Sequence, residues 1–310
     1  MAKEKQTGGK KHITGARIAK EIRQYKKDVF LSPMYTTFCV ILEILIPYLT
    51  ASIIDKGIAV GDMGHVARIG ALMAVMAVLA MFCGMRAGIH SARASTGLAS
   101  NLRESMFARI QDYSFSNIDK FSTAGLVTRL TTDVTNIQNA FQMLLMICTR
   151  APVTLIVALF MAFSISARLS LIFLAAMAFL AVMLFIFIPK AMGYFKQMFK
   201  KYDKVNGVVK ENVGAIRVVK AFVRENYEDK KFSDAASELF QNSISAERII
   251  SFNMPIMQLT VYSCILLISW FGAKMIVNQT GLTTGELTSL LSYVMNILMS
   301  LMMLSMVFVM

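Results

Sequence analysis

Charged residues are scarce in this sequence. They make up 16% of its 310 residues, whereas hydrophobic residues make up 56%, above the roughly 45–50% apolar share of soluble domains. This composition excludes a soluble globular protein. Long apolar runs with few charges, at least the roughly 18–20 residues that cross a bilayer, occur six times and predict an all-α, polytopic membrane protein.

Histidine and cysteine are too few and too scattered to build a reactive centre. The three histidines have no Cys or carboxylate partner at a short helical interval, and the four cysteines fall in four different apolar runs. This pattern favours small, buried cysteine side chains. We therefore expect no metal site and no catalytic residue in this chain.

The six predicted spans alternate with loops of very different charge. The spans cover residues 30–54, 66–89, 141–163, 169–189, 255–277 and 287–309. An even number of spans places both termini on one side. With cations near a span end, such as Arg86, counted on their nearest side, the segments on that side hold 27 Lys and Arg residues, against four on the other side. The positive-inside rule then predicts cytoplasmic termini, and topology explains the net charge of +13 without nucleic-acid binding.

The N-terminal segment is basic and partly periodic. Residues 1–15 predict a basic cytoplasmic tail, and Ile18, Ile22, Tyr25 and Val29 recur at helical spacing among cations. We therefore predict an interfacial amphipathic helix over residues 16–29. A disordered basic tail held near anionic lipid is the alternative, and it suits residues 1–12 better. The apolar run that follows is too long for a signal peptide, so the first span is expected to remain.

Proline is absent between Lys190 and Met254, which suits continuous helix. The long segments 90–140 and 190–254 are therefore predicted to form cytoplasmic helical hairpins. Each tip combines a glycine with apolar residues, which are Phe115, Ile118 and Phe121 in the first and Ile216, Val218, Val219 and Phe222 in the second. So many exposed apolar residues indicate a docking surface. Alternatively, the tips cover each other or only close their own hairpins.

Several further motifs accompany the two tips in a fixed order. They are Glu43-Ile-Leu-Ile-Pro47, Ile54-Asp-Lys-Gly57-Ile, Arg150-Ala-Pro152 and Thr284-Gly-Glu-Leu287. Together with the tips they resemble the transmembrane domain of ABC exporters with the six-helix, type IV arrangement, over essentially the whole chain. The resemblance implies that the tips are coupling helices, which dock on nucleotide-binding domains. By match of motif these would be Asn117, Ile118, Asp119, Lys120 and Phe121, and Ala215, Ile216, Arg217, Val218 and Val219.

A nucleotide-binding domain itself is missing. The phosphate-binding pattern Gly-x-x-x-x-Gly-Lys-Ser/Thr does not occur, so this chain alone is expected not to hydrolyse ATP. The resemblance implies that ATP and Mg²⁺ act through a nucleotide-binding domain, fused or separate, and that a second transmembrane domain completes a homodimer or heterodimer. It also points to a bacterial plasma membrane. Because the last apolar run reaches Met310 without a cationic anchor, we expect a truncated chain.

Polar chemistry inside the predicted membrane is sparse. Glu43 and Arg150 are the only full charges deep in the spans. Glu43 is a contact for cationic substrates or part of a gate, and Arg150 is an interhelix tether. The alternative for both residues is structural pairing or snorkelling. With Glu43, residues Met295, Met299 and Met302 form the candidate substrate pathway, although these methionines also suit packing or lipid contact.

Two classes of function follow from these patterns. The first is the membrane-spanning half of an ATP-driven exporter of hydrophobic or amphipathic compounds, of a multidrug or lipid-like kind. The alternative is a nucleotide-independent scaffold or a proton-coupled secondary carrier that would use Glu43. The alternative gives no purpose to the long hairpins.

Overall fold

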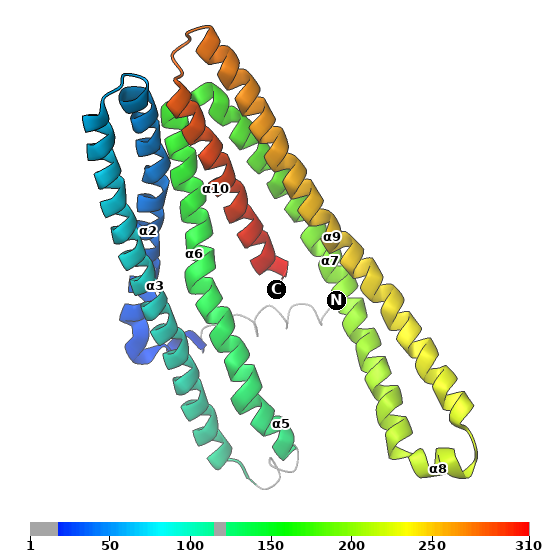
Figure 1. Cartoon of the computed structure of the whole chain (residues 1–310). Coiled ribbons are helices and arrows are strands. Elements are labelled where there is room, and N and C mark those ends of the chain that lie inside the picture. Colours follow the sequence, from blue (N-terminus) through cyan, green and yellow to red (C-terminus); the bar gives the residue numbers. More distant parts are fainter. Residues whose placement is uncertain (1–17, 115–121, 310) are drawn as a thin grey trace, which may run out of the picture. The chain divides into compact units, whose positions relative to one another are not determined.

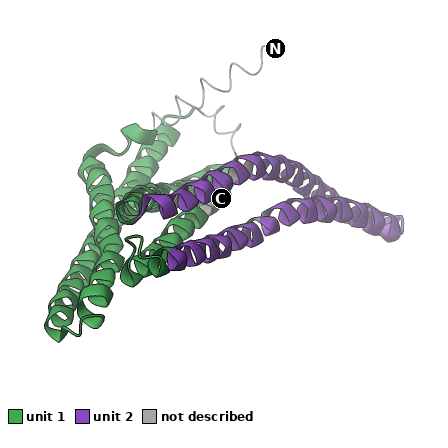
Figure 2. Ribbon diagram, turned by 90° about the horizontal axis from the view of Figure 1, so that it is seen from above, with its two compact units in different colours: residues 1–165, 275–307 green, residues 166–274, 308–310 purple. Residues whose placement is uncertain are grey.

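The computed structural model describes residues 18–114 and 122–309, which are helical and contain no β-strand. These residues divide into two compact units (Figure 2). The first holds the described residues up to Ile165 together with Met275–Val307, and the second holds Ser166–Lys274 with the end of the last helix. The all-α prediction is confirmed.

The first unit contains four long helical stretches (Figure 1). Their elements are η1 (Arg23–Tyr25), α2 (Lys26–Ser52), the π-helical η2 (Ile53–Ile58), α3 (Met63–Gln111), α5 (Thr123–Thr128), the π-helical η3 (Arg129–Asp133), α6 (Val134–Ile165) and α10 (Thr284–Val309). Small residues let α2 and α3 approach closely, because Ala87, Ser91 and Ala94 of α3 are buried. Ser32 Oγ of α2 donates to the Ala87 carbonyl at 3.1 Å across this contact.

The second unit is one very long helical hairpin. Helix α7 (Ala167–Gly214) runs to the tip, the short α8 (Ile216–Ala221) crosses it, and α9 (Glu225–Val277) returns beside α7 (Figure 1). Helix α7 has 48 residues, about 70 Å at 1.5 Å per residue, more than twice the roughly 30 Å hydrocarbon core of a bilayer. The predicted helical hairpin is therefore present, and most of it extends beyond any lipid.

Six helical stretches among the described residues are long and apolar enough to cross a membrane. Five of the six predicted spans fall inside these stretches. The sixth, 287–309, begins inside Thr284–Leu304 and follows α10 to Val309, so the six-helix architecture is confirmed. In α3 and α7 the helix continues well past the predicted end of the span. Nothing in the backbone marks the point where the lipid would end.

The predicted interfacial helix over 16–29 differs from the structure. Residues 18–20 are helical, a turn and η1 follow, and α2 begins only at Lys26. Arg23 adopts a positive φ of 40°, which is strained for a residue with a side chain. We call residues 18–25 the N-terminal elbow. Its apolar residues Ile18 and Ile22 pack on a protein cluster that includes Leu98 and Val134, so this face is covered by helices α3 and α6.

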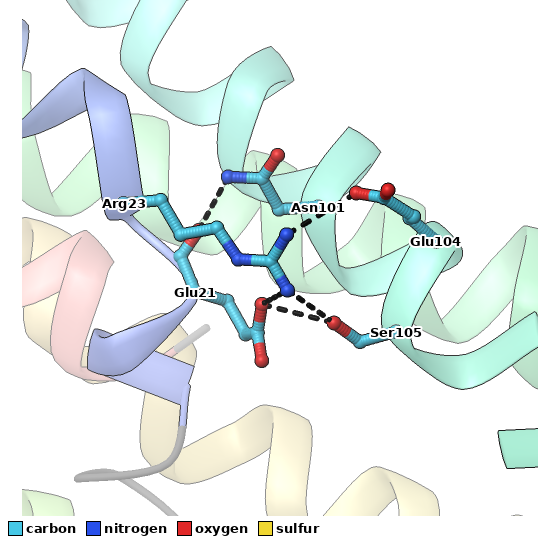
Figure 3. Close-up of polar contacts among 5 residues, drawn as sticks. All are labelled: Glu21, Arg23, Asn101, Glu104 and Ser105. Atoms are coloured by element: carbon cyan, nitrogen blue, oxygen red, sulfur yellow. Dashed lines mark hydrogen bonds and ion pairs between the residues drawn. The ribbon is translucent and has the colours of Figure 1, made fainter. Parts of the chain in front are cut away.

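Polar contacts hold the elbow in this bent form (Figure 3). Asn101 of α3 donates to the Glu21 carbonyl at 2.7 Å, and Ser105 Oγ donates to the Glu21 carboxylate at 3.0 Å. Arg23 forms ion pairs with Glu21 at 2.9 Å and with Glu104 at 3.2 Å. A straight helix would place these groups elsewhere. The contacts with α3 thus offset the strain at Arg23.

Gly97 lets the elbow dock against α3. A Cβ atom built on Gly97 would overlap the ring of Tyr25, whereas one built on Gly88 of the same helix meets nothing within 4 Å. We predict that Gly97→Val displaces the elbow and costs about 1–3 kcal/mol, as overpacking does. Trypsin should then cleave after Lys20 and Arg23 several-fold faster, and the thermal unfolding midpoint should fall. Equal cleavage rates in Gly97→Val and in the control Gly88→Val would contradict the docking.

Candidate functional site

The tip of the second hairpin is built from a sharp turn on each side of α8. Helix α7 ends at Gly214, and Ala215 precedes α8 with φ −105° and ψ 16°. After α8, Val223 takes a positive φ of 51°, which reverses the chain before α9. Lys220 then pairs with Glu225 at 3.0 Å. The Glu225 carboxylate accepts hydrogen bonds from its own backbone amide and from Lys220. Both lower the pKa of this carboxyl, and the bond from the amide has the larger effect.

Apolar side chains point outward from this tip. Val218 is 57% exposed, Phe222 73% and Val223 80%, while Val219 is buried under the helix. Of the five predicted coupling residues here, Ala215 precedes α8 and Ile216, Arg217, Val218 and Val219 lie on it. The hairpin therefore does not close over its own apolar residues. This outcome favours the docking surface over the alternative that they only close their own hairpin.

Two hollows flank α8. One has a volume of about 460 Å³ and is bordered by Val213, Ile216 and Phe232. The other has a volume of about 510 Å³ and is bordered by Val218, Phe222 and Tyr227. Both hollows also include charged residues in their lining. Apolar ridges beside hollows of mixed polarity give a surface that a complementary protein can interdigitate with.

The tip of the first hairpin is only partly described. Helix α3 ends at Gln111, and Ser122 caps α5 by accepting a hydrogen bond from the Gly125 amide at 3.2 Å. The predicted coupling residues Asn117, Ile118, Asp119, Lys120 and Phe121 lie outside the described residues.

Ion pairs align the two arms of the second hairpin. Lys201 and Lys204 of α7 both contact Glu238 of α9, at 2.6 and 3.1 Å, and Lys231 contacts Glu211 at 2.9 Å. Hydrogen bonds from Lys201 and Lys204 lower the pKa of Glu238, and the bond to Glu211 raises the pKa of Lys231. The contacts set the register of α7 against α9. Helix α8 is therefore held by two helices that are joined to each other.

The two charges deep in the predicted spans meet. Arg150 of α6 donates to Glu43 of α2 at 2.5 Å, and Cys39 Sγ lies 3.4 Å from the other carboxylate oxygen. Sequence reasoning raised structural pairing for each charge without naming the partner. Pairing keeps either charge from standing alone in a low-dielectric environment, where it would be costly. Among the described residues, the polar contacts of Glu43 run to Arg150 and Cys39.

The three methionines of the predicted pathway lie on the less packed face of α10. Met295 is 46% and Met299 60% exposed, and Met302 is half-buried, whereas Tyr293 and Val294 are fully buried. The predicted pathway residues on α10 are thus available for contact. None of the polar contacts of Glu43 involves them.

Two motifs that are far apart in the sequence contact each other, and their spacing does not predict this contact. Asp55 of η2 accepts hydrogen bonds from the Gly285 amide at 2.9 Å and from the Thr283 hydroxyl at 2.5 Å. Gly285 must be glycine here, because a Cβ atom would lie 2.5 Å from the Ala51 carbonyl oxygen. Farther along the helices, Ser289 and Tyr293 of α10 donate to the carbonyls of Pro47 and Ile44.

Comparison with known proteins gives one family for almost the whole chain. The sequence model for the ABC transporter transmembrane region matches residues 29–302. The uncharacterized ABC transporter ATP-binding protein YfiB of Bacillus subtilis is 32% identical over 252 residues, which are 81% of this chain and 44% of that protein. An uncharacterized ABC transporter ATP-binding protein of Mycobacterium tuberculosis is 30% identical over 291 residues, 94% of this chain and 50% of that protein.

More distant relatives carry a functional name. An ATP-dependent lipid A-core flippase of Albidiferax ferrireducens is 24% identical over 282 residues, 89% of this chain and 48% of that protein. The chain thus spans about half the length of the curated relatives it matches.

The ion pair between Glu43 and Arg150 can be tested by a mutant cycle. Arg150→Met leaves the Glu43 carboxylate unpaired, and we expect a loss of about 1–3 kcal/mol, less than the roughly 3–5 kcal/mol of a fully buried pair. The expected loss of stability is smaller because the side chains of Arg150 and Glu43 are 44% and 40% exposed. The double variant Glu43→Gln/Arg150→Met should regain most of the loss in thermal unfolding midpoint. Arg168→Met, which removes an exposed cation, is the control; additive losses in the double variant would contradict the pairing.

Proposed function

The chain belongs to the family of ABC transporter transmembrane regions, and from this premise we propose that it forms the membrane-spanning half of an ATP-driven exporter. In this proposal its helices line the substrate pathway, and its hairpin tips couple that pathway to nucleotide-binding domains. The observation that carries the proposal is the exposed apolar tip at α8, held by a long, paired hairpin. Relatives of about twice the length named as ATP-binding proteins support it.

Coupling follows from the shape of the second unit. Closure of a nucleotide-binding domain against α8 would push on the apolar ridge of Val218 and Phe222, which are exposed for contact. Helices α7 and α9 would transmit the push, because ion pairs to Glu238 and Glu211 restrain sliding between them. In the same way, the tip of the first hairpin, near Asn117 to Phe121, would form a second contact with a nucleotide-binding domain.

Family membership and the distribution of charge support the proposed membrane topology and the remaining partners. The excess of Lys and Arg in the hairpins and N-terminal segment supports cytoplasmic termini and a multi-pass location in a bacterial plasma membrane. ATP and Mg²⁺ would bind to the nucleotide-binding domain, fused or separate. A second transmembrane domain, identical or related, would complete the pathway.

The exposed side chains of α10 support a class of substrate for the proposed pathway. Exposed, flexible methionine side chains such as Met295 and Met299 suit hydrophobic or amphipathic compounds of varied shape. Relatives named lipid A-core flippases support an amphipathic, lipid-like substrate. Because Glu43 is paired with Arg150, a cationic substrate would have to compete with Arg150 for this carboxylate.

The coupling role predicts a crosslink at α8. With the four native cysteines replaced by serine, Arg217→Cys should crosslink to a nucleotide-binding domain in native membrane vesicles, and ATP should change the yield several-fold. Lys210→Cys, an exposed position on α7 that removes the same charge, is the matched control. Mass spectrometry of the adduct identifies the partner, whether fused or separate. No adduct with a nucleotide-binding domain, or equal yields at both positions, would sink the proposal.

The pathway role predicts a change in transport with intact ATP hydrolysis. In proteoliposomes that contain the complete transporter, Met295→Ala/Met299→Ala should lower ATP-dependent movement of a fluorescent lipid analogue or a hydrophobic dye several-fold. Met81→Ala, an exposed methionine of α3, is the control. If Glu43→Gln leaves the transport of every tested cation unchanged, Glu43 is not a contact for cationic substrates. Movement that follows a proton gradient and ignores ATP would support the secondary carrier instead.

A further inference from the structure

A groove lies along α7 where the apolar span gives way to the hairpin. It has a volume of about 820 Å³, within the roughly 300–1,000 Å³ of typical ligand sites. Its lining includes Met192, Phe195, Lys196, Phe199, Lys200 and Asp203. These residues recur at helical spacing on one side of α7, just after Pro189, the predicted end of the fourth span. The groove therefore sits at the depth of the lipid headgroups on the side of the hairpin tips.

The cations of this groove differ from their neighbours on the same helix. Lys201 and Lys204 face α9 and share Glu238. Among the described residues, neither Lys196 nor Lys200 has an ion pair or hydrogen bond. They lie one turn apart, so both ammonium groups can reach a single anion. Asp203 is three residues beyond Lys200, at the end of the groove farther from the span.

Within the described part of the second unit, the apolar side chains of the groove are partly or largely exposed. Met192 is 56% exposed and Phe199 61% exposed, and Phe195 is half-buried beside them. Met192 and Phe195 lie on the span side of both lysines, and Phe199 lies between them along the helix. Apolar side chains that precede and accompany free cations are the arrangement of an interfacial surface.

We propose that this groove binds an anionic phospholipid from the leaflet on the side of the hairpin tips. Lys196 and Lys200 hold the headgroup phosphate, and Met192, Phe195 and Phe199 contact the upper part of the acyl chains. Charge complementarity selects an anionic over a zwitterionic lipid. The residues of this site belong to α7 and include none of the candidate pathway residues of α2 and α10, and the proposal does not depend on ATP-driven export.

The test measures lipid binding to the full chain in detergent by native mass spectrometry. Phosphatidylglycerol and phosphatidylcholine of the same chain length are titrated separately. Lys196→Gln/Lys200→Gln should weaken phosphatidylglycerol binding by roughly 25-fold, at about fivefold for each lysine near an anionic lipid. Phosphatidylcholine binding should not change. Lys210→Gln/Lys230→Gln, which removes two exposed hairpin lysines outside the groove, should retain wild-type binding. Asp203→Asn should strengthen it.

Each other outcome overturns the site. Equal losses in the two double variants would mean general attraction between a basic protein and an anionic lipid. Displacement of the lipid by millimolar inorganic phosphate, with Phe199→Ser binding normally, would mean a phosphate site without an acyl contact. A shift from dimer to monomer in Lys196→Gln/Lys200→Gln, with lipid adducts unchanged, would mean that a second copy of the chain covers the groove.

Discussion

The bilayer cannot hydrogen-bond a polypeptide backbone, and the rest of this structure depends on that constraint. Every span must satisfy its own amide and carbonyl groups, so each is a continuous helix even where Pro47 or Pro152 removes a donor. The same constraint applies to side chains. The two charges placed deep in the spans, Glu43 and Arg150, are joined to each other. Helix packing there relies on small residues such as Ala87, because lipid gives apolar helices no reason to associate.

Beyond the lipid the same helices are stabilised differently. Helices α7 and α9 continue without a break, but their contacts become ion pairs, with Glu238 bound by two lysines, together with buried small residues such as Ala235 and Ala246. A two-helix hairpin has little core, and its use is mechanical. It holds α8 far from the membrane and presents Val218 and Phe222 to a partner. A hairpin that served only to connect two spans would have no need of this length or of an apolar tip.

The order of helices could be predicted from the sequence because apolar runs and the absence of proline are local properties. The second tip was located for the same reason. The partner of Arg150 could not be found in this way, since Glu43 is 107 residues away and a pairing depends on how α2 and α6 face each other. The bend in the described part of the predicted N-terminal helix has another cause. The spacing of Ile18 and Ile22 is the same for a face that meets lipid and a face that packs on α3 and α6, and the strained turn at Arg23 has no sequence signal.

The contacts of α10 explain why a methionine-rich face remains free. One side of this helix is bound at three levels, through the Asp55 carboxylate of η2 and the carbonyls of Pro47 and Ile44 of α2. The bonds to the two carbonyls lie within the apolar span, where water is scarce and a broken bond is costly. Rotation of α10 is thereby restricted, and Met295 and Met299 are kept turned away from α2. A surface that adapts to varied apolar compounds can be flexible in its side chains only if the helix that carries it is held in place.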